Sequence, residues 1–273
     1  MKFLSRALLL LLTSNFSTAD ACEPIDYLDM ALPAGPHAAE IMAVLAAYPD
    51  LSFDADRQQF STKSGVILPL GEVRDVGPLK RLASATIAEQ FVYRYPLEFD
   101  LEQRKSAFQD PGRLRNDAFF RAIYFAGKKE ARKSLARVDF NDGFRARFMV
   151  TQKRNVACQL DAVFADLSRM EPDFSKFFRK AGGSFNWRTI SGTTRLSAHS
   201  FGIAVDLNTE LGQYWKWSGA QVGNVGEYRN KFPEALVMTF ERYGFIWGGK
   251  WHHYDGMHFE FRPEIILFSR MME

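Results

Sequence analysis

The apolar positions of the first hundred residues predict few regular elements. Ile41, Val44 and Leu45 recur at helical spacing and predict a helix over residues 37–47. Residues 60–73 are rich in glycine and β-branched side chains, a composition typical of either a strand pair or an irregular loop. The start of the chain therefore predicts one helix, followed by either a strand pair or an irregular loop.

Beyond that point, helical and strand patterns alternate irregularly. Helical periodicity is found in residues 78–91, 116–125, 128–133, 156–170 and 233–243. Two-residue alternation or a short buried apolar run is found in residues 144–151, 203–207 and 258–261. This order predicts an α+β fold, with a small, mostly antiparallel sheet and helices on one side of it. We expect residues 22–109 to be an N-terminal extension that packs on or caps a main domain of residues 110–273.

Residues 1–21 have the pattern of a secretory signal peptide. Lys2 and Arg6 precede a short apolar run, and the small residues Ala19 and Ala21 fit a cleavage site. That run is too short to span a bilayer, and no later apolar segment is long enough. We therefore expect a periplasmic or secreted protein without a transmembrane segment. A lipoprotein is the less favoured alternative, because lipoprotein signals usually carry a larger aliphatic residue at the position of Ala19.

Composition and charge are those of a globular enzyme. Hydrophobic residues make up 47% of the chain and the net charge is only +3, which argues against bulk electrostatic binding of nucleic acid. The two cysteines are Cys22 and Cys158. In an oxidising compartment they can form one disulfide, and the alternative is two unpaired thiols. Composition does not determine the oligomeric state.

Four of the five histidines lie in two stretches, residues 197–208 and 251–261. His199, Asp206 and His258 can supply three ligands to a zinc ion and leave a fourth position for water. A lone histidine in an apolar strand is usually a core residue, whereas two histidines and two aspartates in this order favour a metal site. The sequence therefore predicts a site for one Zn²⁺ ion.

The spacing of the candidate ligands requires a bend in the chain. His199 and Asp206 are seven residues apart, so an unbroken strand would point them to opposite faces. Gly202 lies between them and tolerates backbone angles that permit such a bend. In the second stretch, strand alternation places His258 and Glu260 on one face. The three ligands can then face one point, and we expect Glu260 to orient a histidine ligand.

The order of these motifs resembles a family of bacterial zinc peptidases. Ser-x-His-x-x-Gly-x-Ala-x-Asp begins at Ser197, and Trp-Gly-Gly-Lys-Trp-x-His-x-Asp-x-Met-His-Phe-Glu begins at Trp247. Together they resemble the family of VanY-type D-alanyl-D-alanine carboxypeptidases and L-alanyl-D-glutamate endopeptidases. The resemblance covers roughly residues 110–264 and implies a fold like that of hedgehog-type zinc domains.

The resemblance also implies roles for individual residues. By it, the zinc ligands are His199, Asp206 and His258, the general base is Asp255, and the residue that stabilises the oxyanion is Arg188. The chemistry agrees, because a carboxylate of raised pKa can accept the proton of a zinc-activated water. A guanidinium provides a permanent charge and a fork of donors for an oxyanion or a terminal carboxylate. An arginine that follows a tryptophan is otherwise more often part of a surface ion pair.

Two further residues in the motifs have alternative interpretations. Ser197 is either a turn cap or a hydrogen-bond donor to substrate. His253 either contacts substrate at the rim of the site or forms part of an aromatic wall. Residues 214–217 are aromatic and can line a groove, although packing is the more usual role of such residues.

The sequence as a whole predicts an exported zinc peptidase that hydrolyses amide bonds in the peptide stem of peptidoglycan. Two alternatives remain open. One is a peptidase for small free peptides, which differs only in the shape of its pocket. The other is a zinc-stabilised wall- or partner-binding module without turnover, which would need neither Asp255 nor Arg188.

Overall fold

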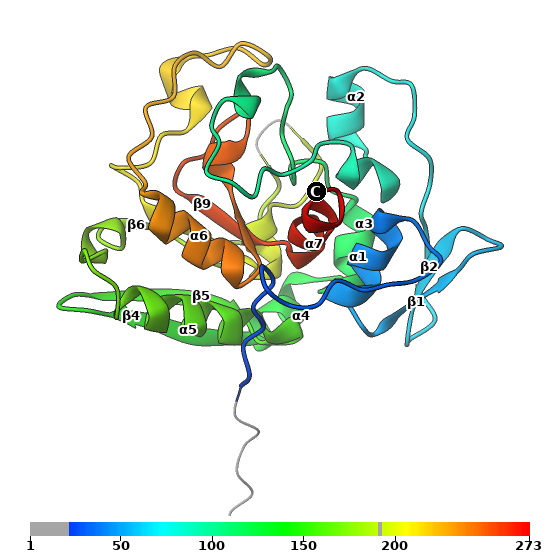
Figure 1. Ribbon diagram of the computed structural model, residues 1–273, viewed down its shortest axis with the longest axis horizontal. Coiled ribbons are helices and arrows are strands. Elements are labelled where there is room, and N and C mark those ends of the chain that lie inside the picture. The colour runs from blue at the N-terminus through cyan, green and yellow to red at the C-terminus, as the bar shows by residue number, and fades with distance from the viewer. Residues whose placement is uncertain (1–21, 191–192) are drawn as a thin grey trace, which may run out of the picture.

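The described part of the protein, residues 22–190 and 193–273 of a computed structural model, has an α+β fold with three small antiparallel sheets (Figure 1). The predicted signal peptide lies outside the described residues. The α-helices are α1 (Ala39–Ala47), α2 (Pro78–Ala83), α3 (Asp117–Ile123), α4 (Lys128–Lys133), α5 (Val156–Leu167), α6 (Glu234–Arg242) and α7 (Pro263–Met271). The strands are β1 (Leu51–Asp54), β2 (Gln59–Thr62), β3 (Ile67–Pro69), β4 (Leu135–Asn141), β5 (Arg145–Thr151), β6 (Ala181–Gly183), β7 (Ala204–Asn208), β8 (Phe245–Trp247) and β9 (His258–Phe261).

The largest sheet has four strands in the order β6-β7-β9-β8, and all of its pairings are antiparallel. Its two faces differ in chemistry, as the predicted alternation along residues 258–261 requires. Phe259 points toward α6, and its ring stacks on Phe240 with a centroid distance of 4.1 Å. His258 and Glu260 occupy the opposite face of the same strand. One face is therefore part of the hydrophobic core, and the other carries polar chemistry.

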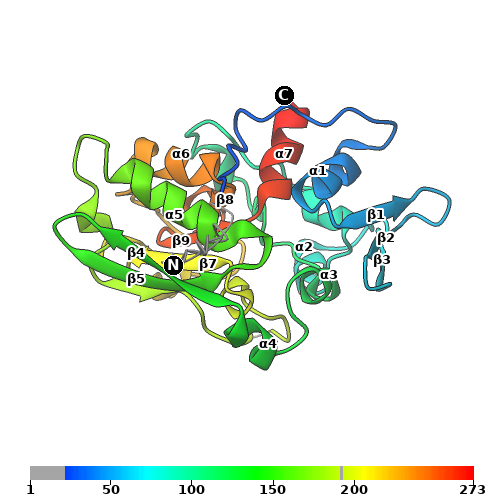
Figure 2. The same cartoon turned by 90° about the horizontal axis from the view of Figure 1, so that it is seen from below.

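A long hairpin, β4–β5, and helix α5 form a second layer (Figures 1 and 2). Phe148 of β5 and Phe140 of β4 pack against Phe164 of α5, with ring centroids 5.5 and 5.7 Å apart. The predicted strand at 144–151 is confirmed as β5. The predicted helix at 156–170 is confirmed but ends earlier, at Leu167.

The N-terminal residues share a core with the rest of the chain. Helix α1 packs on α7, and the Tyr48 hydroxyl donates a hydrogen bond of 2.6 Å to Glu264. Strands β1, β2 and β3 form a small sheet beside these helices (Figure 2). Of the two expectations for residues 60–73, the strand pair is confirmed, because β2 pairs with β3.

The prediction of one helix over residues 78–91 is wrong. The segment contains the short helix α2 and a separate 3-10 helix, Ala88–Phe91. Thr86 accounts for the break, because its Oγ1 accepts a hydrogen bond from the Glu89 N–H while the Glu89 carboxylate accepts one from the Thr86 N–H. This reciprocal pair is a capping box, which begins a new helix.

The structure joins Cys22 to Cys158 by a disulfide, with a Cα–Cα distance of 5.8 Å. The bond connects the first described residue to helix α5. Among the described helices, none combines the length and the apolar character that a membrane span requires.

Candidate metal centre

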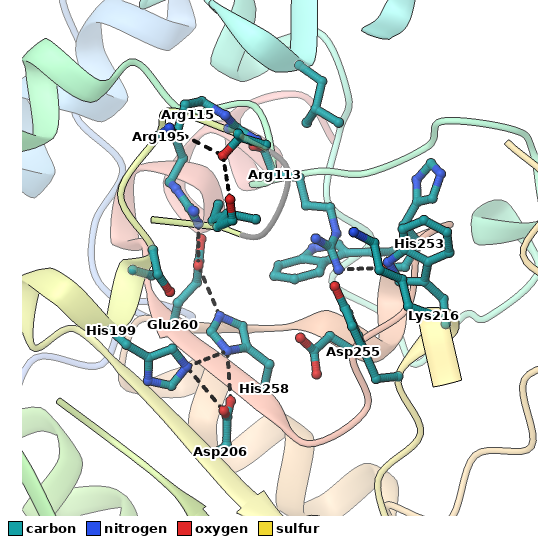
Figure 3. Close-up of a pocket in the computed structure, with 18 of the residues that line it drawn as sticks. Arg113, Arg115, Arg195, His199, Asp206, Lys216, His253, Asp255, His258 and Glu260 are labelled. Atoms are coloured by element: carbon teal, nitrogen blue, oxygen red, sulfur yellow. Dashed lines mark hydrogen bonds and ion pairs between the residues drawn. The ribbon is translucent and has the colours of Figure 1, made fainter. Parts of the chain in front are cut away.

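His199, Asp206 and His258 come together on the polar face of the central sheet (Figure 3). One ligand-type atom from each lies within 4.8 Å of the other two. His199 Nε2 is 3.2 Å from His258 Nδ1 and 3.2 Å from Asp206 Oδ2, and His258 Nδ1 is 2.9 Å from Asp206 Oδ1. Two imidazole nitrogens and a carboxylate therefore converge on one point, as the sequence predicted.

Local backbone structure explains this convergence. His199 lies in a one-turn 3-10 helix, Ala198–Phe201, which ends at Gly202. Gly202 has a left-handed conformation with φ of 69°, and a Cβ there would lie 3.0 Å from both Leu135 and the Thr151 backbone. The chain turns at this glycine before β7 begins, so the predicted bend is present, and any other residue there would be strained.

A second set of contacts orients the two imidazoles. The carbonyl oxygen of Ser184 accepts a hydrogen bond from His199 Nδ1, so the proton of a neutral ring stays on Nδ1 and Nε2 faces the cluster. Glu260 Oε2 lies 3.1 Å from His258 Nε2, which leaves Nδ1 to face the cluster. Arg115 in turn donates to Glu260 at 2.7 Å. Such contacts fix the ring orientation and tautomer of histidine ligands in metal sites.

The electrostatics of the cluster favour a positive charge. Burial lowers the pKa of His258, but the carboxylates of Asp206 and Glu260 raise it overall to about 10. Burial also opposes ionisation of Asp206, yet the neighbouring His199 and His258 hold the pKa of its carboxyl well below the usual range. The negative charge that stabilises protonated His258 would also stabilise a metal cation at this position.

The cluster lies in the wall of a cavity of about 570 Å³. Asp255 also lines this cavity, and its carboxylate points into the same space as the His258 ring (Figure 3). Burial raises the pKa of Asp255 to about 6, with a further contribution from Asp206 that the charge of His258 opposes. It occupies the turn that the sequence predicted, and a carboxylate with such a pKa can exchange protons near neutral pH.

Three other candidate residues line the same cavity in different ways. Arg188 is exposed at the rim, and its guanidinium contacts only the Thr189 carbonyl, at 3.5 Å, among the described residues. Ser197 is buried beside the cluster. His253 donates to Asp110 at 2.6 Å and accepts from the Gly223 N–H at 3.0 Å, so both ring nitrogens already have partners. Its ring can contact a ligand only through its face or edge.

The sequence did not single out several residues that also line the cavity. Arg115 and Arg195 lie beyond Glu260, as seen from the candidate metal ligands, whereas the Arg113 side chain extends toward His253 (Figure 3). On the outer rim, Trp217 is 63% exposed, and residues 214–217 line the cavity, although packing is the more usual role of such aromatic residues.

Comparison with known proteins gives one match. Residues 191–261 match a family model described as D-alanyl-D-alanine carboxypeptidase. The matched segment contains all three candidate metal ligands and Asp255, and it leaves out Arg188. No curated protein and no solved structure matches the chain. The match supports a zinc peptidase of the D-alanyl-D-alanine type without specifying which member of that group the chain is similar to.

Proposed function

We propose that this protein is an exported zinc metallopeptidase that hydrolyses amide bonds in the stem peptides of peptidoglycan. The observation that carries the proposal is the convergence of His199, Asp206 and His258 beside an open cavity that also holds Asp255. The family match over residues 191–261 supports the reaction class. The bond is of the D-alanyl-D-alanine carboxypeptidase type or the L-alanyl-D-glutamate endopeptidase type.

The donor set fits zinc. Two imidazoles and one carboxylate make a three-ligand protein set, and the cavity beside them leaves space for a further ligand. The contacts of His199 with Ser184 and of His258 with Glu260 fit the support that metal-bound imidazoles need. Bound zinc would supply Lewis acidity, which activates water and polarises a carbonyl group.

The remaining roles belong to other side chains. Asp255 takes a proton from the attacking water and gives it to the leaving amine, and its pKa of about 6 suits both steps. Arg188 reaches over the rim and stabilises the negative charge that develops on the carbonyl oxygen. Ser197 donates a hydrogen bond to substrate, and His253 contacts substrate through its ring.

The N-terminal extension, residues 22–109, contributes to the pocket in this proposal. Leu79, Leu82 and Ala83 of the α2 segment line the cavity, as does Trp217. They give the outer part of the pocket an apolar wall, whereas the inner part is charged. The extension therefore caps the site and narrows the set of substrates that can reach the metal.

Digestion of purified peptidoglycan by the zinc-loaded mature chain tests the proposal. Release of single D-alanine identifies a carboxypeptidase, and a cut between L-alanine and D-glutamate identifies an endopeptidase. Short free peptides, tested in parallel, separate a wall enzyme from a general small-peptide peptidase. If the protein binds zinc but releases no product from any of these substrates, it is a binding module and the enzymatic proposal is wrong.

A further inference from the structure

Arg195 is a buried cation without a carboxylate partner of its own. Its exposed fraction is 7%, and within the described residues no carboxylate oxygen lies within ion-pair distance of its guanidinium. Its Nη1 donates to the Arg113 carbonyl oxygen at 3.0 Å, while its buried Nε has no hydrogen-bond partner. Buried arginines are normally paired, so this side chain needs an explanation.

The acidic groups near Arg195 already have other partners. Asp117 pairs with Arg121 at 2.6 Å. Glu260 pairs with Arg115 at 2.7 Å. Burial and the charges of Arg115 and Arg113 together lower the pKa of Arg195 to about 9. This end of the pocket therefore holds more positive charge than the neighbouring carboxylates neutralise.

Arg113 adds a second guanidinium to the lining of the same cavity. Its Nη2 donates to the His253 carbonyl oxygen at 2.5 Å, and its guanidinium stacks over the Trp251 ring at 4.5 Å. Among the described residues its Nε has no hydrogen-bond partner, and its closest carboxylate is Asp110 at 3.9 Å. Asp110 is itself held by His253. Both arginines line the cavity that contains the candidate metal ligands, so a ligand in this cavity can reach them.

We propose that Arg195 and Arg113 form a carboxylate-binding subsite in the wall of the metal pocket, and that it holds a free carboxylate of the peptide substrate. The planar fork of a guanidinium matches the geometry of a carboxylate, and a bound anion would provide the negative charge that this part of the cavity lining lacks. The identity of the substrate rests on the proposed function, whereas the anion site itself does not. The subsite would select peptides that carry a free carboxylate near the scissile amide.

Binding of small probes to the metal-free full mature chain tests the subsite directly. N-acetyl-D-alanine and N-acetyl-D-alaninamide differ only in the carboxylate, and prior removal of zinc prevents the carboxylate from binding a metal. We expect the acid to raise the melting temperature of the wild type and the amide to have little effect. Arg195→Met should abolish this difference. Arg229→Met, at an exposed arginine paired with Glu227, is the matched control and should retain it.

The variants also separate a binding role from a structural one. Because Arg195→Met removes an unpaired buried charge, the ligand-free variant should melt no lower than the wild type. A structural arginine would give the opposite result, a lower melting temperature with the preference for the acid intact. Arg195→Lys keeps the charge without the planar fork and should retain only part of the preference. It also serves as the test if the methionine variant does not fold.

Hydrolysis by the zinc-loaded protein distinguishes this inference from the proposed function. We expect kcat/KM for stem peptides with a free carboxylate to exceed that for amidated peptides by about 10- to 100-fold, and Arg195→Met to remove this preference. Equal hydrolysis of both peptides by the wild type would overturn the subsite while the peptidase proposal stands. An Arg195-dependent response to the acid probe, with no peptide hydrolysed, would support the subsite and overturn the peptidase.

Discussion

Asp206 and His258 lie directly opposite each other on β7 and β9, and their side chains meet with Oδ1 and Nδ1 2.9 Å apart. Hydrogen-bonded strands set this register, so two of the three candidate ligands are held by the sheet. His199 joins them from a short turn that Gly202 ends. The backbone therefore positions all three candidate ligands, and loss of one of them should be measurable as loss of metal.

His258→Ala should therefore remove zinc from the protein. One imidazole of the three-ligand set is lost, and the remaining two groups hold the ion far more weakly. We expect less than about one tenth of the wild-type zinc content after dialysis, measured by inductively coupled plasma mass spectrometry. His37→Ala, which changes a histidine outside the pocket, should leave the zinc content unchanged. Full zinc occupancy in the His258 variant would contradict its role as a ligand.

Asp255→Asn should retain zinc and lose turnover. The amide has nearly the shape of the carboxylate but cannot accept the proton of the attacking water, so kcat should fall by about 10²- to 10⁴-fold. Asp56→Asn changes an exposed aspartate that does not line the cavity, and this control should keep full activity. We would measure kcat and zinc content on the same samples. A low kcat with full zinc content indicates loss of the base, and a low zinc content indicates loss of the metal.

The pH dependence of the wild type gives a second test of Asp255. Burial raises the pKa of Asp255 to about 6, and only the ionised form acts as a base. Activity should therefore be full well above that pKa and fall as the pH drops through it. A bound cation favours the ionised form, so the acid limb of kcat/KM should lie at or below about pH 6. A flat profile between pH 4 and 8 would argue against this base.

The convergence of the candidate ligands could be predicted from the sequence because its signals are local. Residue types, their order and the glycine between His199 and Asp206 indicate the candidate ligands, and alternation along β9 separates His258 and Glu260 from the core. The break after α2 also had a local signal, since Thr86 and Glu89 have the spacing of a capping box. Helical periodicity alone, which ignores this signal, gave one helix in place of two.

The proposed carboxylate-binding subsite, Arg113 and Arg195, could not be predicted in the same way. Arg113 and Arg195 are 82 residues apart, and neither has a pattern that indicates burial. Their unusual feature is the lack of nearby unpaired carboxylates, which depends on how distant segments pack. Similarly, the sequence prediction did not include β4 or α7, because their positions depend on partners elsewhere in the fold.

Arg188→Gln should lower kcat with a smaller effect on KM. The guanidinium is exposed at the rim and makes one long hydrogen bond, to the Thr189 carbonyl, among the described residues, so it is available to the developing oxyanion. Removal of one oxyanion donor typically costs about 10²- to 10³-fold in kcat. Arg57→Gln, at an exposed arginine paired with Asp54, is the control. An increase in KM alone would assign Arg188 to substrate binding instead.

Glu89 should make the stability of the protein sensitive to acid. Burial would raise the pKa of its carboxyl, but hydrogen bonds from Arg74 and from the Thr86 N–H lower the pKa to about 2. Because the folded pKa lies below the unfolded value of 4.5, ionised Glu89 stabilises the fold above pH 4.5. This contribution should decrease as the pH falls from 4.5 to about 2.

Glu89→Gln measures this contribution. The variant leaves Arg74 and the capping contact without a carboxylate, so at pH 7 its free energy of unfolding should be about 2–3 kcal/mol lower, as urea titration would show. Near pH 3 the difference from the wild type should shrink, because the unfolded wild type then binds a proton that its folded state lacks. Glu102→Gln breaks an exposed pair with Lys105 and should change stability by less than about 1 kcal/mol at either pH. An equal difference at pH 7 and pH 3 would mean that Glu89 acts through shape and packing and not through its charge.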